Sequence, residues 1–119
     1  MGEMLNIRLE RSVLDWRTRL GRSTSIRYLD DLSASLKPEG WRFVKLYWPT
    51  PIPILRIYAR GPAEIALMVS ALAVPHGLWG YHEAPLGRSG YLHPCGDADA
   101  AAHAIGRLLK SSMYPSTAW

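Results

Sequence analysis

Apolar residues in the first forty positions recur at helical spacing. They fall three or four residues apart between Met4 and Leu20, which predicts a helix with one apolar stripe: Leu5, Leu9, Val13, Trp16 and Leu20. The competing interpretation is a short strand over residues 5–9 and a helix that starts at Ser12. After a small polar break over residues 21–25, a second helix is predicted, which presents Ile26, Leu29, Leu32 and Leu36 on one face and ends in Lys37-Pro38-Glu39-Gly40.

The pattern then changes to alternation. Residues 41–48 and 54–60 predict two strands, and the prolines between them predict a turn, because proline cannot donate to a strand ladder. We place Val44, Leu46, Leu55 and Ile57 on the inward face of this hairpin. A second hairpin is predicted over residues 78–83 and 90–94.

Each hairpin is followed by an Ala-rich segment that predicts a helix. Residues 63–74 are apolar almost all round, which favours a central buried helix that starts after Gly61 and Pro62. Residues 98–110 form the last predicted helix, with Asp97 or Gly96 as its N-cap. The tail over residues 111–119 is polar and contains proline, and we expect it to be loosely held.

A shift of 35 positions places Gly61-Pro62-Ala63-Glu64-Ile65-Ala66 on Gly96-Asp97-Ala98-Asp99-Ala100-Ala101. This weak repeat indicates one unit written twice. The predicted fold is α+β, in a single domain over residues 1–119. Two strand-strand-helix units, 41–75 and 76–110, form a four-stranded, mostly antiparallel sheet with two helices on one face, preceded by a helical segment over residues 1–40.

Composition narrows the class of protein. The chain has 119 residues, 48% of them hydrophobic, which suits one core. Its single cysteine, Cys95, excludes an intramolecular disulfide and favours a cytoplasmic location. The longest apolar stretch is about half a membrane span, and no signal-peptide pattern is present, so no membrane partner is expected. The net charge of +4 lies mainly in the first 45 residues.

Two surfaces are candidates for binding. The first is a sheet face that mixes aromatic and cationic residues, as single-stranded nucleic acid requires: Phe43, Lys45, Tyr47, Arg56, Tyr58, His82, Tyr91 and His93. The second is a basic arm formed by Arg8, Arg11, Arg17 and Arg19. The Trp16 stripe can also cover the sheet face, and two copies can stack there. A sheet motif typical of RNA-binding domains is absent.

Reactive side chains are sparse. His76, His82, His93 and Cys95 have metal-ligating chemistry, but their spacing does not fit a closed zinc site, so no metal or cofactor is predicted. Cys95 with a histidine and Asp97 is a conceivable nucleophile set. A small buried thiol and a helix cap explain these residues more simply. Gly87-Arg88-Ser89-Gly90 resembles a phosphate loop but joins two strands.

These observations favour a small, non-enzymatic module that binds another protein or self-associates as a homodimer, with an accessory or regulatory role. Aromatic residues and arginine are the usual interface anchors, and the chain has five Trp and six Tyr. The alternative is a nucleic-acid-binding accessory protein that uses the aromatic and basic sheet face. A cysteine and histidine enzyme is the second alternative.

Overall fold

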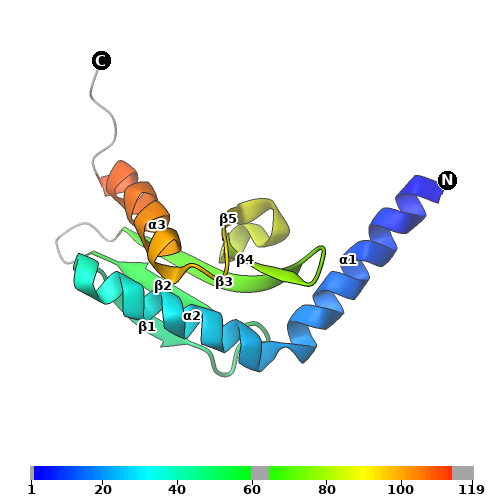
Figure 1. Ribbon diagram of the computed structural model, residues 1–119, viewed down its shortest axis with the longest axis horizontal. Helices are drawn as coiled ribbons and strands as arrows, with labels where there is room; N and C mark the ends of the chain where they lie inside the picture. Colours follow the sequence, from blue (N-terminus) through cyan, green and yellow to red (C-terminus); the bar gives the residue numbers. More distant parts are fainter. Residues whose placement is uncertain (1, 60–64, 114–119) are drawn as a thin grey trace, which may run out of the picture.

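The structure, a computed structural model, describes residues 2–59 and 65–113, with the backbone alone for residues 2–8 and 113. Figure 1 shows the elements in chain order. They are α1 (Gly2–Leu20), α2 (Arg22–Leu36), the 3-10 helix η1 (Lys37–Glu39), β1 (Arg42–Leu46), β2 (Ile54–Tyr58), β3 (Ala66–Val74), β4 (Leu78–Glu83), the 3-10 helix η2 (Ala84–Gly90), β5 (Tyr91–Pro94) and α3 (Ala98–Met113).

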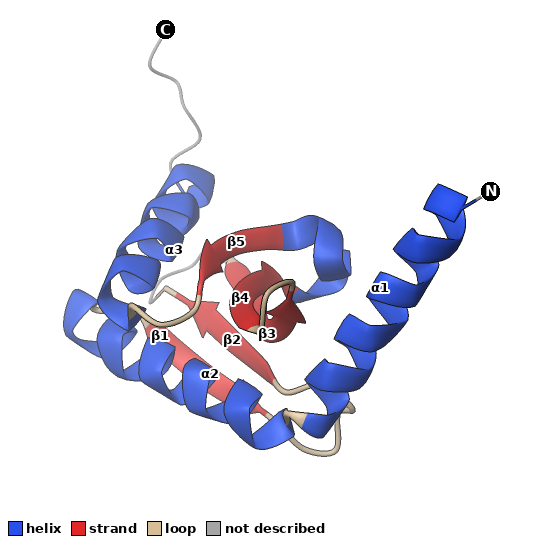
Figure 2. Cartoon of the chain, turned by 45° about the vertical axis from the view of Figure 1, so that its right-hand side comes forward, coloured by secondary structure: helices blue, strands red, loops and turns tan. Residues whose placement is uncertain are grey.

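The five strands form one antiparallel sheet in the order β1-β2-β3-β4-β5. Every strand therefore pairs with its neighbour in sequence (Figure 2). The predicted α+β class and the helical N-terminal segment are confirmed, and α1 is one continuous helix rather than a strand followed by a helix. The predicted four-stranded sheet is wrong, because the sheet has a fifth strand.

That fifth strand is β3, which occupies most of the segment predicted to be a helix over residues 63–74. The proposed start of that helix, Gly61 to Glu64, lies outside the described residues. Strand β3 is the central strand, and most of its side chains are buried on both faces, with Val69 and Ala71 toward the helices. A continuous apolar run suits a strand covered on both sides as well as a buried helix, so periodicity alone does not separate the two. The 35-residue repeat therefore does not correspond to a repeated structural unit.

The predicted facing of β1 is also wrong, by a register of one residue. Lys45 pairs with Leu55, and Val44 pairs with Arg56. A four-residue turn would instead have placed Lys45 opposite Arg56. Because successive side chains on a strand point to opposite faces, this slip exchanges the two faces of β1. Val44 and Leu46 consequently share a face with Arg56 instead of with Leu55 and Ile57.

Helices α2 and α3 pack against each other on one face of the sheet, with α3 rising from one end of α2, and they enclose the core (Figures 1 and 2). The core combines Leu29, Leu32 and Leu36 of α2, Ala101, Ala102, Ile105 and Leu109 of α3, and sheet residues that include Leu55, Ile57, Val69 and Tyr81. The Tyr81 hydroxyl donates to Tyr28 O at 2.6 Å, which satisfies the one polar atom of this buried side chain. On the other face, η2 packs against β3 and β4.

Helix α1 leaves this body at an elbow between Leu20 and Arg22 and projects beyond the sheet (Figure 1). The Arg22 guanidinium donates to Tyr47 O, to Thr50 O at 2.8 Å and to Pro51 O at 3.0 Å, and it lies 3.9 Å from the centre of the Trp48 ring. The elbow is thereby fixed to the loop between β1 and β2. The direction of α1 follows from these contacts and from its own attachment to β3.

Candidate functional site

The candidate site is an exposed apolar stripe on α1, formed by Leu9, Val13, Trp16 and Leu20. Each of these side chains is between 52% and 66% exposed, although together they form one face of the helix. The sequence pattern extends the stripe to Leu5, whose side chain is outside the described part of the chain. An exposed run of large apolar side chains on a helix is typical of a surface that another molecule covers.

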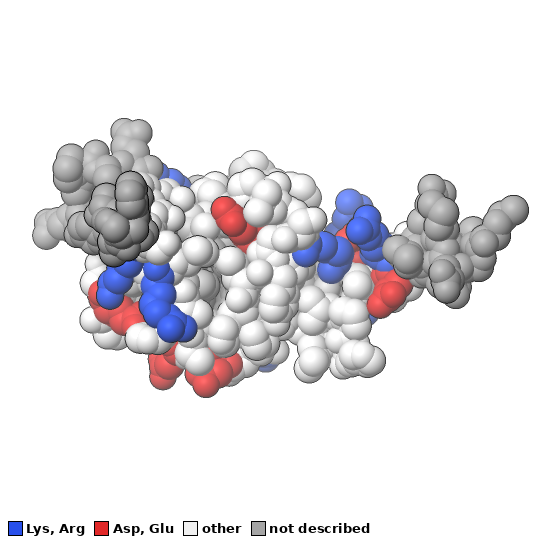
Figure 3. Space-filling model, turned by 90° about the horizontal axis from the view of Figure 1, so that it is seen from above, with Lys and Arg blue, Asp and Glu red and all other residues white. Residues whose placement is uncertain are grey.

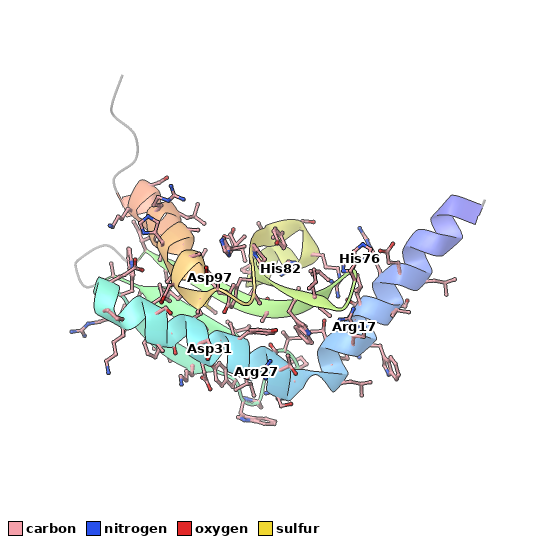
Figure 4. All side chains as sticks on the ribbon, in the orientation of Figure 1. Arg17, Arg27, Asp31, His76, His82 and Asp97 are labelled. Atoms are coloured by element: carbon pink, nitrogen blue, oxygen red, sulfur yellow. The ribbon has the colours of Figure 1, made fainter. Side chains whose placement is uncertain are left out.

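The opposite side of α1 attaches it to the body. Leu14 and Thr18 are buried there. Thr18 Oγ1 accepts from Ala73 N at 2.9 Å and donates to Leu14 O at 2.9 Å, and Arg17 Nη1 donates to Val74 O at 3.1 Å. Figure 4 shows Arg17 directed from α1 toward the turn between β3 and β4, where His76 lies. Because polar contacts at residues 14–18 hold the helix, its apolar stripe is left facing away from the sheet.

The sheet face predicted from sequence is divided between the two sides of the sheet. Phe43, Lys45 and Tyr47 face α2, where Phe43 packs against the core and Tyr47 is buried. Lys45 Nζ lies 2.8 Å from Asp30 Oδ1, and the Tyr47 hydroxyl donates to the same carboxylate at 2.9 Å. Burial, and next the hydrogen bond to Asp30, raises the pKa of Tyr47. Phe43, Lys45 and Tyr47 therefore belong to the packing between the sheet and α2.

The remaining sheet candidates lie mainly on the other face. Arg56 and Tyr58 are half-buried there, with the guanidinium 5.0 Å from the ring centre. His82 is only 1% exposed and meets the Tyr91 ring edge-on at 5.4 Å. A β-bulge places His93 opposite Tyr81 and separates it from this group. The structure therefore does not assemble the eight residues into one binding surface.

The histidine and cysteine cluster is likewise dispersed. His76 lies in the turn between β3 and β4, and His82 is buried under η2 (Figure 4). Burial raises the pKa of the Cys95 thiol to about 12, an effect that a hydrogen bond with Tyr81 partly offsets. A thiol with that pKa is a poor nucleophile near neutral pH, because the thiolate is the reactive form. Within residues 2–59 and 65–113, no group of three or more His, Cys, Asp or Glu residues is arranged to hold a metal ion.

Asp97 has a structural role at the start of α3. Its Oδ1 accepts from Ala100 N at 3.0 Å, which confirms the predicted N-cap. Asp99, in the first turn, accepts from Ser35 Oγ of α2 at 2.7 Å and ties the two helices together. These carboxylates are therefore explained by helix capping and packing.

The predicted basic arm faces more than one way. Arg17 is tied to β3, whereas Arg11 and Arg19 line a cleft between α1 and η2, with Arg88 on its other wall. The side chain of Arg8 is outside the described residues. Sequence reasoning did not predict this cleft, because Asp15 and Arg88, which meet across it, are 73 positions apart.

The fold and these surfaces define a small α+β protein with a projecting, partly apolar helix. Comparison with known proteins finds no matching family model, no similar curated protein and no similar solved structure. None of the described helices is both long enough and apolar enough to cross a membrane.

Proposed function

We propose that this chain is a small, non-enzymatic module that self-associates through α1, with an accessory or regulatory role. The observation that carries the proposal is the exposure of Leu9, Val13, Trp16 and Leu20 on a helix whose buried side chains, among residues 9–20, lie on its opposite side. An exposed helix with few tertiary contacts gains little stability from its own backbone. Packing of the stripe against another surface would supply the missing stabilisation.

The spacing of the stripe favours a second helix as its partner. Leu9, Val13, Trp16 and Leu20 are separated by four, three and four residues, which is the d-a-d-a order of a heptad. Two such stripes can interdigitate, and Trp16 supplies the large aromatic anchor that interfaces favour. The second helix is the α1 of another copy, because a two-fold axis pairs identical stripes without any further partner.

Charge complementarity selects the antiparallel arrangement. In this heptad register, Glu10 and Arg17 both occupy e positions, which meet each other across an antiparallel pair. Each Glu10 would then lie beside Arg17 of the second copy, twice per dimer. A parallel pair would instead set Glu10 against Leu5 and Arg17 against Ser12. Arg17 retains free donors for this contact, because a guanidinium has five and Val74 O takes one.

The first test is the mass of the protein in solution, measured by light scattering after size exclusion over a range of concentrations. We expect a dimer whose dissociation constant rises at least about tenfold in Leu20→Ser and in Trp16→Ser, because each substitution removes about 1–2 kcal/mol of apolar burial from both copies. Leu108→Ser is the matched control, since Leu108 is an exposed leucine on α3 at the other end of the molecule. A wild-type monomer at every concentration would refute the proposal.

Charge reversal tests the antiparallel pairing separately. Glu10→Arg should weaken the dimer, because arginine then faces Arg17 of the second copy. Arg17→Glu alone should also weaken the dimer, because it sets glutamate against Glu10 and removes the hydrogen bond to Val74 O. The two substitutions together should weaken the dimer by less than the sum of the single effects, and additive losses would argue against the proposed register. An oligonucleotide that binds at low salt and dissociates steeply at high salt would instead favour the nucleic-acid alternative.

A further inference from the structure

A groove crosses the face of the sheet that carries η2, and the self-association proposed above does not use it. It consists of two adjoining hollows of about 380 Å³ and 240 Å³. The larger hollow lies between α1 and η2. The smaller one lies over β2 and β3, between η2 and the loop after β1. Ile52, Leu72 and Gly87 line both hollows, so the two are continuous.

The larger hollow is electropositive. Arg11, Arg19 and Arg88 line it with a single carboxylate, Asp15. Figure 3 shows Lys and Arg side chains gathered toward the α1 end of the molecule, with acidic side chains beside them. Arg88 is held in place, because its Nε and Nη2 donate to Asp15 Oδ1 at 3.0 and 2.9 Å and its Nη1 donates to Ala73 O at 2.6 Å. Asp15 thus neutralises Arg88, and the charges of Arg11 and Arg19 remain in excess.

The smaller hollow is mainly apolar. Ile52, Ile54, Leu72 and Ala84 are apolar residues of its wall, and the hydroxyl-bearing Ser70 and Thr50 also line it. The Thr50 hydroxyl already has backbone acceptors, because it lies 3.0 Å from Leu46 O and 3.1 Å from Tyr47 O. Taken together, the two hollows reach the size of small-molecule sites, which are mainly apolar with a few polar groups. The groove therefore offers an apolar floor that leads to a basic mouth.

We infer that this groove binds a small amphipathic anion, a carboxylate on an unbranched or compact apolar body. The apolar body lies over Ile54 and Leu72, and the carboxylate lies at the basic mouth, beside Arg11 or Arg19. Arginine suits a carboxylate because its planar guanidinium donates two parallel hydrogen bonds to it. The apolar stripe of α1 faces away from the groove, so ligand binding and self-association use different sides of the same helix.

Octanoate is the probe, with 1-octanol and inorganic phosphate as controls that lack the charge or the apolar chain. Binding is measured by amide chemical shifts during titration. We expect octanoate to shift amides of α1, β3 and η2, and to bind at least about fivefold more tightly than either control, because only octanoate satisfies both parts of the groove. Arg11→Gln and Arg19→Gln should each weaken octanoate binding about threefold to tenfold. Arg107→Gln, an exposed arginine on α3, is the matched control and should leave it unchanged.

Ala84→Leu tests the apolar part without altering any charge. The added side chain fills the smaller hollow, so octanoate binding should be lost while the thermal midpoint stays near that of the wild type. The inference would be overturned if octanoate did not bind the wild-type protein, or if 1-octanol bound as tightly as octanoate. It would also be overturned if octanoate bound Ala84→Leu or Arg19→Gln as tightly as it binds the wild type. Octanoate binding should persist in Trp16→Ser, which weakens the dimer. The ligand proposal and the self-association proposal can therefore fail independently of each other.

Discussion

At the residue scale, His82 shows how burial under η2 makes stability depend on pH. The ring is enclosed between β4, Tyr91 and η2, and its Nδ1 lies 2.8 Å from Gly80 O. Burial lowers the pKa of His82; the hydrogen bond with Gly80 opposes this, and the charge of Arg88 adds to it. The neutral ring is therefore the form that the fold accommodates.

We expect acid to destabilise the protein through this residue. The unfolded chain takes up a proton at His82 as the pH falls below about 6.5, whereas the folded chain does not, so stability is lost between that pH and the lower pKa of the folded state. The slope from one such group can reach about 1.4 kcal/mol per pH unit. Urea unfolding at pH 7.5 and pH 5.5 measures the change.

His82→Gln and His103→Gln separate this effect from general acid sensitivity. His82→Gln lowers stability at pH 7.5 but should flatten the decline toward pH 5.5. His103→Gln, at an exposed position on α3, should decline as the wild type does. Equal declines in all three proteins would show that His82 does not control the pH dependence.

Residue-level chemistry was predictable from sequence where it is local. The Asp97 cap depends on a spacing of three residues, and the sequence indicates it directly. The partners of Lys45 were not predictable, because its contact with Asp30 depends on the register of β1 against β2 and on how α2 crosses the sheet. The pair of Asp15 and Arg88 was not predictable either, because α1 and η2 are far apart in the sequence. This pair leaves Arg11 and Arg19 as the cleft residues with excess positive charge.

At the scale of elements, periodicity predicted the three α-helices and every described strand except β3, whereas the sequence predicts only a loop between two strands in place of the 3-10 helix η2. Amphipathic elements reveal themselves because one side is polar, as in α2 and β2. The nine residues of β3 are almost entirely apolar, since helices cover one face and η2 part of the other. Such a run has no period that separates strand from helix, and its role follows only from the pairing of β2 and β4 with its two edges.

The elbow between α1 and α2 depends on a glycine. A Cβ atom built on Gly21 would lie 2.6 Å from Trp79 Cζ2 and 3.0 Å from Arg17 O. We expect Gly21→Ala to lower the free energy of unfolding by about 1–3 kcal/mol, because the indole of β4 must move away from the elbow. Thermal and urea unfolding of the purified variant provide the measurement.

Trp79→Leu gives the matched test of this cause. A smaller side chain leaves room for the added methyl group, so Gly21→Ala should cost much less in the Trp79→Leu background than in the wild type. Additive losses in the double variant would mean that the indole is not what limits the residue at position 21. The same variants report on α1, because its direction is set at this elbow.

At the scale of the whole molecule, α1 is an element whose stability depends on what surrounds it. The sheet and α2 are stabilised by a common core, whereas the contacts described for α1 attach one side of residues 14–18 to β3. The sequence predicted the helix and its stripe, but the direction of the stripe depends on Thr18 and Arg17 reaching the end of β3. Self-association would therefore stabilise α1 far more than the sheet.

Hydrogen exchange at two protein concentrations tests this difference directly. We expect the α1 amides of residues 9–20 to exchange more slowly at high concentration, because dimerisation stabilises the only state in which the stripe is covered. Amides of β2, β3 and β4 should not respond, since their protection comes from packing within one copy. In Trp16→Ser, α1 should exchange rapidly at both concentrations. If α1 in the wild type were as protected as β3 at every concentration, contacts within one chain would suffice to hold it, and the stripe would need no second copy.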